Sequence, residues 1–217
     1  MNYDVKIRLK IPKINYSETA KHYDKLRPLE TEIWLSKIIE FGSIKEEDIV
    51  LDFGCGTGRY TLNIFKSVYP RVCGLDVSNN MIKQALEKDK DKNVYWINAD
   101  GQKLPFRSDS FDCLYMTLVM HQIQNREEAL RDIYRTLKIM GRIVTLTNSH
   151  ARLKRHLLSH FSGVIKKDLD RFPTILTIKK TMKSIGFTHV EYKPIEYNEY
   201  ISRMNLLKEC RINMFQH

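Results

Sequence analysis

Short apolar runs alternate with longer amphipathic stretches from residue 48 to residue 148, and this alternation restricts the fold more than any other feature. The runs predicted to be strands cover residues 48–53, 71–77, 93–99, 111–120 and 141–148. The stretches predicted to be helices cover residues 58–68, 79–88 and 125–138. Strands that alternate with helices in this way form a parallel sheet, and the helices cover both of its faces. The sequence therefore predicts an α/β fold: a doubly wound, mostly parallel sheet in three layers (α/β/α).

The segments on either side of this core show weaker patterns. Residues 3–11 alternate between apolar and charged side chains, which is typical of a half-buried edge strand, and helices are predicted over residues 17–27 and 30–42. After residue 148 the predicted elements are a helix over 150–161, a loop over 168–174, a helix over 174–186, a strand over 187–197 and a helix over 201–215. We expect one domain over residues 1–217, made of an N-terminal part (1–45), the core (46–148) and a basic C-terminal part (149–217).

Positive charge is concentrated in one segment. The formal net charge of the 217-residue chain is +10, and residues 131–183 hold thirteen Lys or Arg against three acids, an excess equal to that whole charge. Such a field can attract an acidic small molecule or a nucleic acid, or it can simply be a solvated lysine-rich surface. The charge pattern alone does not distinguish between these three possibilities.

Cysteine usage and hydropathy exclude several classes of protein. The four cysteines, Cys55, Cys73, Cys113 and Cys210, show neither CxxC pairing nor the spacing of zinc ligands, so we predict reduced, buried thiols and no metal site. No apolar run is long enough to span a bilayer, and the N-terminus lacks the apolar centre of a signal peptide. We therefore expect a cytoplasmic protein without a membrane partner.

A glycine-rich turn follows the first strand of the core, in the stretch VLDFGCGTGRY over residues 50–60. The dinucleotide fingerprint GxGxxG would need a third glycine at Arg59, but the chain has it one place earlier, at Gly58. The triphosphate-binding pattern GxxxxGK[ST] does not occur. A Rossmann-like sheet is thus combined with a turn that brings the backbone close to a ligand without requiring a pyrophosphate.

This stretch resembles motif I of the class I S-adenosylmethionine-dependent methyltransferases. The resemblance continues through GLDVSNNMIKQA, NADGQKLPFRSDSFD and MTLVMHQIQNREEALRDIYRTLKIMGRIV, and it covers about residues 16–195. It points to the broad type 11 or UbiE-like subgroup. It implies S-adenosylmethionine as methyl donor, S-adenosylhomocysteine as product, and no metal.

The resemblance also assigns residues to the amino-acid part of the cofactor. The backbone of Gly54, Cys55 and Gly56 is expected to lie against that part, with Gly58 completing the turn. Asp52 is expected near the ammonium group, directly or through water.

Residues after the next two strands are expected to hold the nucleoside part. The resemblance implies that Asp76 accepts hydrogen bonds from both ribose hydroxyls, because one carboxylate offers two acceptor oxygens. Asp100 is the counterpart of an acid that accepts from the adenine amino group, although beside Gly101 it could also be a turn residue. Val77 and Gln102 are expected to neighbour the adenine.

Two further segments of the resemblance bear on catalysis. Tyr23 and Arg27 match an N-terminal helix that covers the cofactor in the family. There the arginine pairs with the carboxylate of the cofactor, and the tyrosine lines the methyl-transfer pocket. Alternatively, Tyr23 is a core residue and Arg27 is a surface charge. His121, just after the fourth strand, is the candidate general base. Its alternative role is to shape the cofactor pocket.

The chain departs from the family pattern at its C-terminal end. The family sheet has a seventh, antiparallel strand between strands five and six, but after residues 187–197 the sequence predicts only a helix. We expect either a truncated chain or the strand over residues 3–11 in that place, in its own chain or a partner's.

These observations predict a methyltransferase that moves a methyl group by direct displacement to an oxygen or nitrogen of a small molecule. An RNA or peptide methyltransferase that uses residues 131–183 is the first alternative, and a cofactor-binding module without turnover is the second. An NAD-dependent oxidoreductase is disfavoured by Arg59 in place of the third glycine. We expect a monomer or homodimer.

Overall fold

The computed structural model describes residues 20, 24, 31–155 and 162–195. The chain divides into two compact units, residues 16–190 and residues 1–15 with 191–217. All helices and strands of the described part lie within the first unit. The single domain expected over residues 1–217 stays a prediction.

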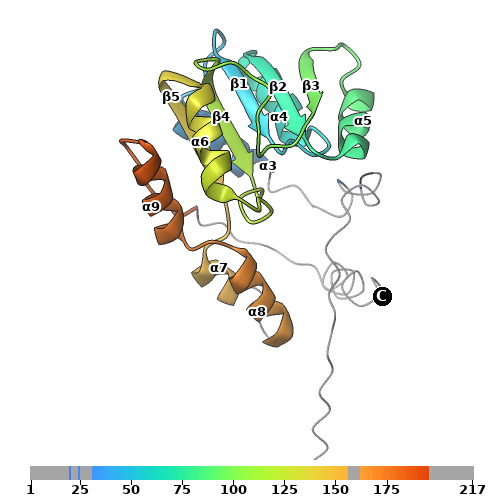
Figure 1. The fold of residues 1–217 in the computed structure, drawn as a ribbon. Coiled ribbons are helices and arrows are strands. Elements are labelled where there is room, and N and C mark those ends of the chain that lie inside the picture. The colour runs from blue at the N-terminus through green and yellow to red at the C-terminus, as the bar shows by residue number, and fades with distance from the viewer. Residues whose placement is uncertain (1–19, 21–23, 25–30, 156–161, 196–217) are drawn as a thin grey trace, which may run out of the picture. The chain divides into compact units, whose positions relative to one another are not determined.

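Within the described residues, five parallel strands form one sheet (Figure 1), in the order β3-β2-β1-β4-β5. They are β1 (Ile49–Phe53), β2 (Arg71–Asp76), β3 (Val94–Asn98), β4 (Phe111–Thr117) and β5 (Leu137–Leu146). The central strands β1 and β4 are almost entirely buried, as expected for a parallel sheet with both faces covered. The predicted α/β fold is confirmed.

Helices pack on both faces of the sheet. One side carries α3 (Thr31–Gly42), α4 (Arg59–Val68) and α5 (Asn79–Lys88), and the other carries α6 (Arg126–Thr136) and α9 (Ile175–Ile185). Side-chain caps fix the first turns of α5, α6 and α9, since Ser78, Asn125 and Thr174 each accept a backbone N–H. After β5 the chain forms α7 (His150–Arg155) and α8 (Ser162–Arg171).

Three predicted elements differ from the structure. β5 begins at Leu137, where a helix was predicted, because Leu137 already pairs with Phe111 before a bulge in β5. The loop prediction over 168–174 is wrong for residues 168–171, which continue α8. The strand prediction over 187–197 is wrong as far as residue 195, since no strand forms there. Alternation of apolar residues indicates a strand, but the strand also needs a neighbour for its backbone hydrogen bonds.

Other predictions fall outside the described residues. These are the strand over 3–11, the helix over 201–215, residues 156–161 of a predicted helix, and most of the helix over 17–27. The proposal that residues 3–11 replace the seventh strand therefore stays a prediction.

The described cysteines are free thiols. Cys55 and Cys113 are buried and Cys73 is partly buried. Burial raises the pKa of the Cys113 thiol to about 12, so this sulfur is not a thiolate at neutral pH.

Candidate functional site

The glycine-rich loop between β1 and α4 is tied to the end of the neighbouring strand. The backbone N–H groups of Gly54 and Cys55 donate to the Leu75 carbonyl, with N···O distances of 2.7 and 3.0 Å. Gly54, Gly56 and Gly58 have φ angles of 74°, 55° and 74°, in the left-handed region that favours glycine. The loop therefore has a fixed conformation at the carboxyl edge of the sheet.

The three glycines differ in what surrounds them. A Cβ atom added to Gly54 would lie 2.5 Å from Cγ2 of Val119, and one added to Gly58 would lie 2.4 Å from the ring of Trp96. A Cβ atom added to Gly56 would meet no atom of the described residues within 4 Å. Packing thus demands glycine at two of the positions, whereas the third faces open space from which a ligand can approach the backbone.

Asp76, the last residue of β2, is held against this loop. Its Oδ2 accepts from the Gly56 N–H at 2.9 Å, and its Oδ1 accepts from the Ser78 N–H at 2.8 Å. Burial raises the pKa of the carboxyl group, although these two backbone donors favour the ionised form. Each carboxylate oxygen can accept more than one hydrogen bond, so Asp76 retains capacity for a pair of ligand hydroxyls.

Asp52 lies beneath the loop near the end of β1, and it is 2% exposed. The Thr61 hydroxyl donates to its Oδ2 at 2.6 Å. Burial raises the pKa of Asp52 to about 7, and the negative charge of Asp76 acts in the same direction. A buried carboxyl group that titrates near neutral pH is well suited to a cationic ligand, which would stabilise its ionised form.

Asp100 and Gln102 form a local turn after β3. Asp100 Oδ1 accepts from the Gln102 backbone N–H at 3.0 Å, and its Oδ2 accepts from Gln102 Nε2 at 3.3 Å. Asp100 is nevertheless exposed, so the turn role and a ligand-binding role are compatible. Val77, after β2, leaves 71% of its surface exposed.

His121, in the turn after β4, is 8% exposed and stacks on Phe172, with ring centroids 4.0 Å apart. The Phe172 carbonyl is hydrogen-bonded by Nε2 of His150 at 2.8 Å. Arg126 donates from Nε to the Met120 carbonyl and from Nη2 to the Arg171 carbonyl, at 3.0 and 2.9 Å. His121 thus lies where the link between α8 and α9 docks on the turn after β4.

Sequence reasoning missed two residues of the site region. Phe172 was correctly predicted to lie in a loop, but its stacking on His121 was not predicted. Asp24 carried no signal at all, yet it accepts a hydrogen bond from the Thr57 hydroxyl of the glycine-rich loop. Tyr23 and Arg27, which were singled out, lie outside the described residues.

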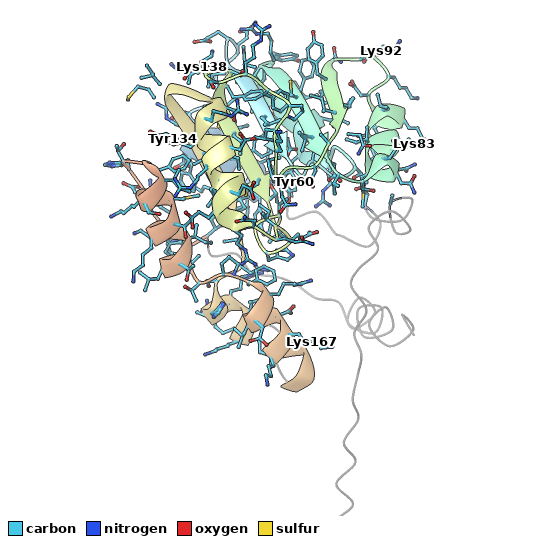
Figure 2. The ribbon with its side chains drawn as sticks, viewed as in Figure 1. Tyr60, Lys83, Lys92, Tyr134, Lys138 and Lys167 are labelled. Carbon is cyan, nitrogen blue, oxygen red and sulfur yellow. The ribbon has the colours of Figure 1, made fainter. Side chains whose placement is uncertain are left out.

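The basic residues of 131–183 do not all belong to one surface. Lys138 pairs with Asp112 at the amino edge of the sheet, at 2.7 Å, whereas Lys167 lies on α8 at a distance from it (Figure 2). Arg131 and Arg135 pair with Glu127 and Asp132 along α6. Part of the positive charge is therefore neutralised within the fold.

The described residues include neither a membrane-spanning helix nor a cluster of metal-binding side chains. None of their helices is both long and apolar enough to cross a membrane. No group of three or more His, Cys, Asp or Glu side chains among them is arranged to hold a metal ion.

Comparison with known proteins gives consistent matches. Residues 51–145 match a family model described as a methyltransferase domain. The chain is 27% identical to a demethylmenaquinone methyltransferase of Lactococcus lactis, with 82% of each chain covered. It is 28% identical to the ubiquinone/menaquinone biosynthesis C-methyltransferase UbiE of Proteus mirabilis, again with 82% of each covered.

A solved structure shares the fold. It is a Haemonchus contortus phosphoethanolamine N-methyltransferase in complex with phosphomonomethylethanolamine and S-adenosylhomocysteine. The TM-score is 0.66 at 23% identity, and the match covers 81% of this chain and 42% of that one.

Proposed function

Within the class I S-adenosylmethionine-dependent methyltransferases, to which this chain belongs, we propose that it methylates an oxygen or nitrogen of a small molecule. The observation that carries the cofactor site is the side of Gly56 that is open among the described residues. The Gly56 N–H donates to Asp76, whose charge in turn acts on the buried Asp52. A backbone free of side chains next to two acids fits a ligand with an ammonium group and a ribose diol.

Each acidic residue at this edge of the sheet would bind a different part of the cofactor. Asp52 would accept from the ammonium group, Asp76 from the two ribose hydroxyls, and Asp100 from the adenine amino group. The bound cofactor supplies a methyl group on a positively charged sulfur, which is already activated for displacement. The chain's own task is to orient the cofactor and the acceptor and to exclude water between them.

The charge distribution supports a small-molecule acceptor. Arg131, Arg135 and Lys138 are engaged in ion pairs within the fold, so part of the charge of residues 131–183 is already neutralised there. An RNA or peptide acceptor is the alternative, and it would be favoured by substrate binding that weakens steeply with added salt.

A carbon acceptor is a second candidate, favoured by the printed names of the two relatives. One is a demethylmenaquinone methyltransferase and the other a C-methyltransferase of quinone biosynthesis. An electron-rich quinol ring could supply the nucleophilic carbon. In that case the ring would lose a proton after the transfer, whereas a hydroxyl would lose its proton during the transfer and a protonated amine would lose its proton before it.

Methyl-labelled S-adenosylmethionine and a cell extract test the proposal. After incubation, the mixture is separated into small molecules, nucleic acid and protein, and tandem mass spectrometry locates the labelled methyl. We expect label in the small-molecule fraction, on oxygen or nitrogen. Label on a ring carbon would support the second candidate, and label in RNA or protein would contradict the proposal. Binding without label in any fraction would indicate a binding module.

Cofactor affinity should depend on the protonation of Asp52. The pKa of its carboxyl group is raised to about 7, so the group is mostly protonated below that pH and mostly ionised above it. Because an ammonium group binds the ionised form, affinity for S-adenosylhomocysteine should rise close to tenfold from about pH 6 to about pH 7.5. Calorimetric titration across this range measures it. The Asp52→Asn variant should bind more weakly with a flat profile, and a flat wild-type profile would argue against the assignment.

The predicted role of His121 as general base can be separated from its packing role. His121→Phe keeps an aromatic ring against Phe172 but cannot accept a proton. If His121 is the base, kcat should fall by roughly a hundredfold or more, while the melting temperature stays close to that of the wild type. Steady-state kinetics and thermal unfolding measure the two effects. Full activity of His121→Phe would instead assign His121 to positioning through Phe172.

A further inference from the structure

Three residues from separate parts of the chain meet at the glycine-rich loop. The Thr57 hydroxyl donates to Oδ1 of Asp24 at 2.6 Å. Lys88 Nζ donates to Oδ2 of the same carboxylate and, at 2.9 Å, to the Thr57 carbonyl. Asp24, Thr57 and Lys88 therefore form a closed set of hydrogen bonds, which we call the loop clamp.

The clamp acts on the part of the loop next to the open side. Thr57 follows Gly56 directly and is 2% exposed, so its backbone position fixes the direction of the preceding peptide. Both its side chain and its carbonyl are held by the clamp. A rotation at Thr57 that displaced its hydroxyl or its carbonyl would break at least one of these bonds.

Helix α5 connects the clamp to the other fixed point of the loop. The helix begins after its N-cap, Ser78, whose N–H donates to Asp76, and Asp76 in turn accepts from the Gly56 N–H. Its last residue is Lys88, which reaches the Thr57 carbonyl. Helix α5 therefore sets the distance between Asp76, which holds Gly56, and Lys88, which holds Thr57.

Charge keeps the clamp formed at neutral pH. Partial burial raises the pKa of Asp24, but hydrogen bonds from Lys88 and Thr57 and the nearby positive charges of Lys88 and Arg59 bring it below the ordinary value. The carboxylate is therefore ionised over the whole range in which Asp52 titrates. Since about a third of each of the Asp24 and Lys88 side chains is exposed, salt should weaken their attraction.

We propose that Asp24 and Lys88 are positioning residues that hold the glycine-rich loop in its binding conformation and thereby set the affinity for the cofactor. This inference rests on the cofactor site described above. Without the clamp the loop would populate other conformations, and apparent affinity would fall in proportion to the binding-competent fraction. Once the cofactor is bound the same site is formed, so methyl transfer itself should be unaffected.

The test compares Asp24→Asn, Lys88→Met and the double variant with wild type, by titration with S-adenosylhomocysteine and by steady-state kinetics. Each single change should weaken binding about tenfold and raise KM for S-adenosylmethionine, with kcat nearly unchanged. The double variant should lose less affinity than the product of the two single effects, because both single changes break the contact between Asp24 and Lys88. Wild-type affinity should also fall with added salt, and that dependence should be smaller in the variants.

Lys83→Met is the matched control, since Lys83 is an exposed lysine of the same helix (Figure 2). Lys88→Arg, which keeps the charge, should retain most of the affinity, and thermal unfolding reports whether each variant folds. Clamp variants that bind as tightly as Lys83→Met would overturn the proposal. A wild-type protein that bound no cofactor would instead overturn the cofactor site, which distinguishes the two failures.

Discussion

Replacing Asp76 with asparagine should weaken the binding of S-adenosylhomocysteine by about a hundredfold or more. The carboxylate is positioned by the N–H groups of Gly56 and Ser78, and its remaining lone pairs would accept two charge-assisted hydrogen bonds from the ribose. Each such bond contributes roughly 1.5–3 kcal/mol. An amide cannot accept at both ends, and its NH₂ group would face a backbone N–H donor. Calorimetric titration measures the loss.

Asp91→Asn provides the control for this prediction, since Asp91 is an exposed acid beyond the end of α5. It removes the same charge from the protein without touching the loop, and it should bind like wild type. If Asp76→Asn and Asp91→Asn had the same affinity, Asp76 would not contact the cofactor.

A single methyl group at Gly56 should abolish cofactor binding while the protein still folds. The added Cβ atom would meet no atom of the described part of the chain within 4 Å, so the Gly56→Ala change causes no clash there. A φ of 55° costs an alanine about 1–2 kcal/mol, which lowers the melting temperature by a few degrees in a chain of this size. The methyl group would instead occupy the open side where we place the cofactor.

Gly58→Ala is the informative comparison, because its Cβ atom would lie 2.4 Å from the Trp96 ring. That variant should lose more stability than Gly56→Ala. Thermal unfolding and titration with S-adenosylhomocysteine separate the two effects. Normal binding by a folded Gly56→Ala protein would show that the cofactor does not approach the loop from this side.

The central part of the fold was predictable because it depends on local patterns. Alternating strands and helices determine a parallel sheet, and parallel strands bring their carboxyl ends to one edge. Asp52, the glycines and Asp76 therefore had to lie near one another once β1 and β2 were identified. The edge of the sheet was harder to predict. The strand predicted over 187–197 needs a neighbouring strand for its backbone hydrogen bonds, and the sequence pattern does not say whether one is present.

Contacts between distant segments were not predictable in the same way. Asp24 and Lys88 contact Thr57 from 33 and 31 residues away in the sequence, and neither residue spacing nor composition predicts these contacts. The docking of Phe172 on His121 likewise depends on how the chain returns after α8. Long-range side-chain contacts of this kind follow from packing, which is decided only when the whole unit is assembled.

A crystal structure of the protein with S-adenosylhomocysteine tests the central claim most directly. We expect the ribose hydroxyls within hydrogen-bonding distance of the Asp76 carboxylate, the amino-acid part along the open side of Gly56, and the ammonium group near Asp52. A ligand bound elsewhere, or one whose ribose makes no contact with Asp76, would contradict the site described here.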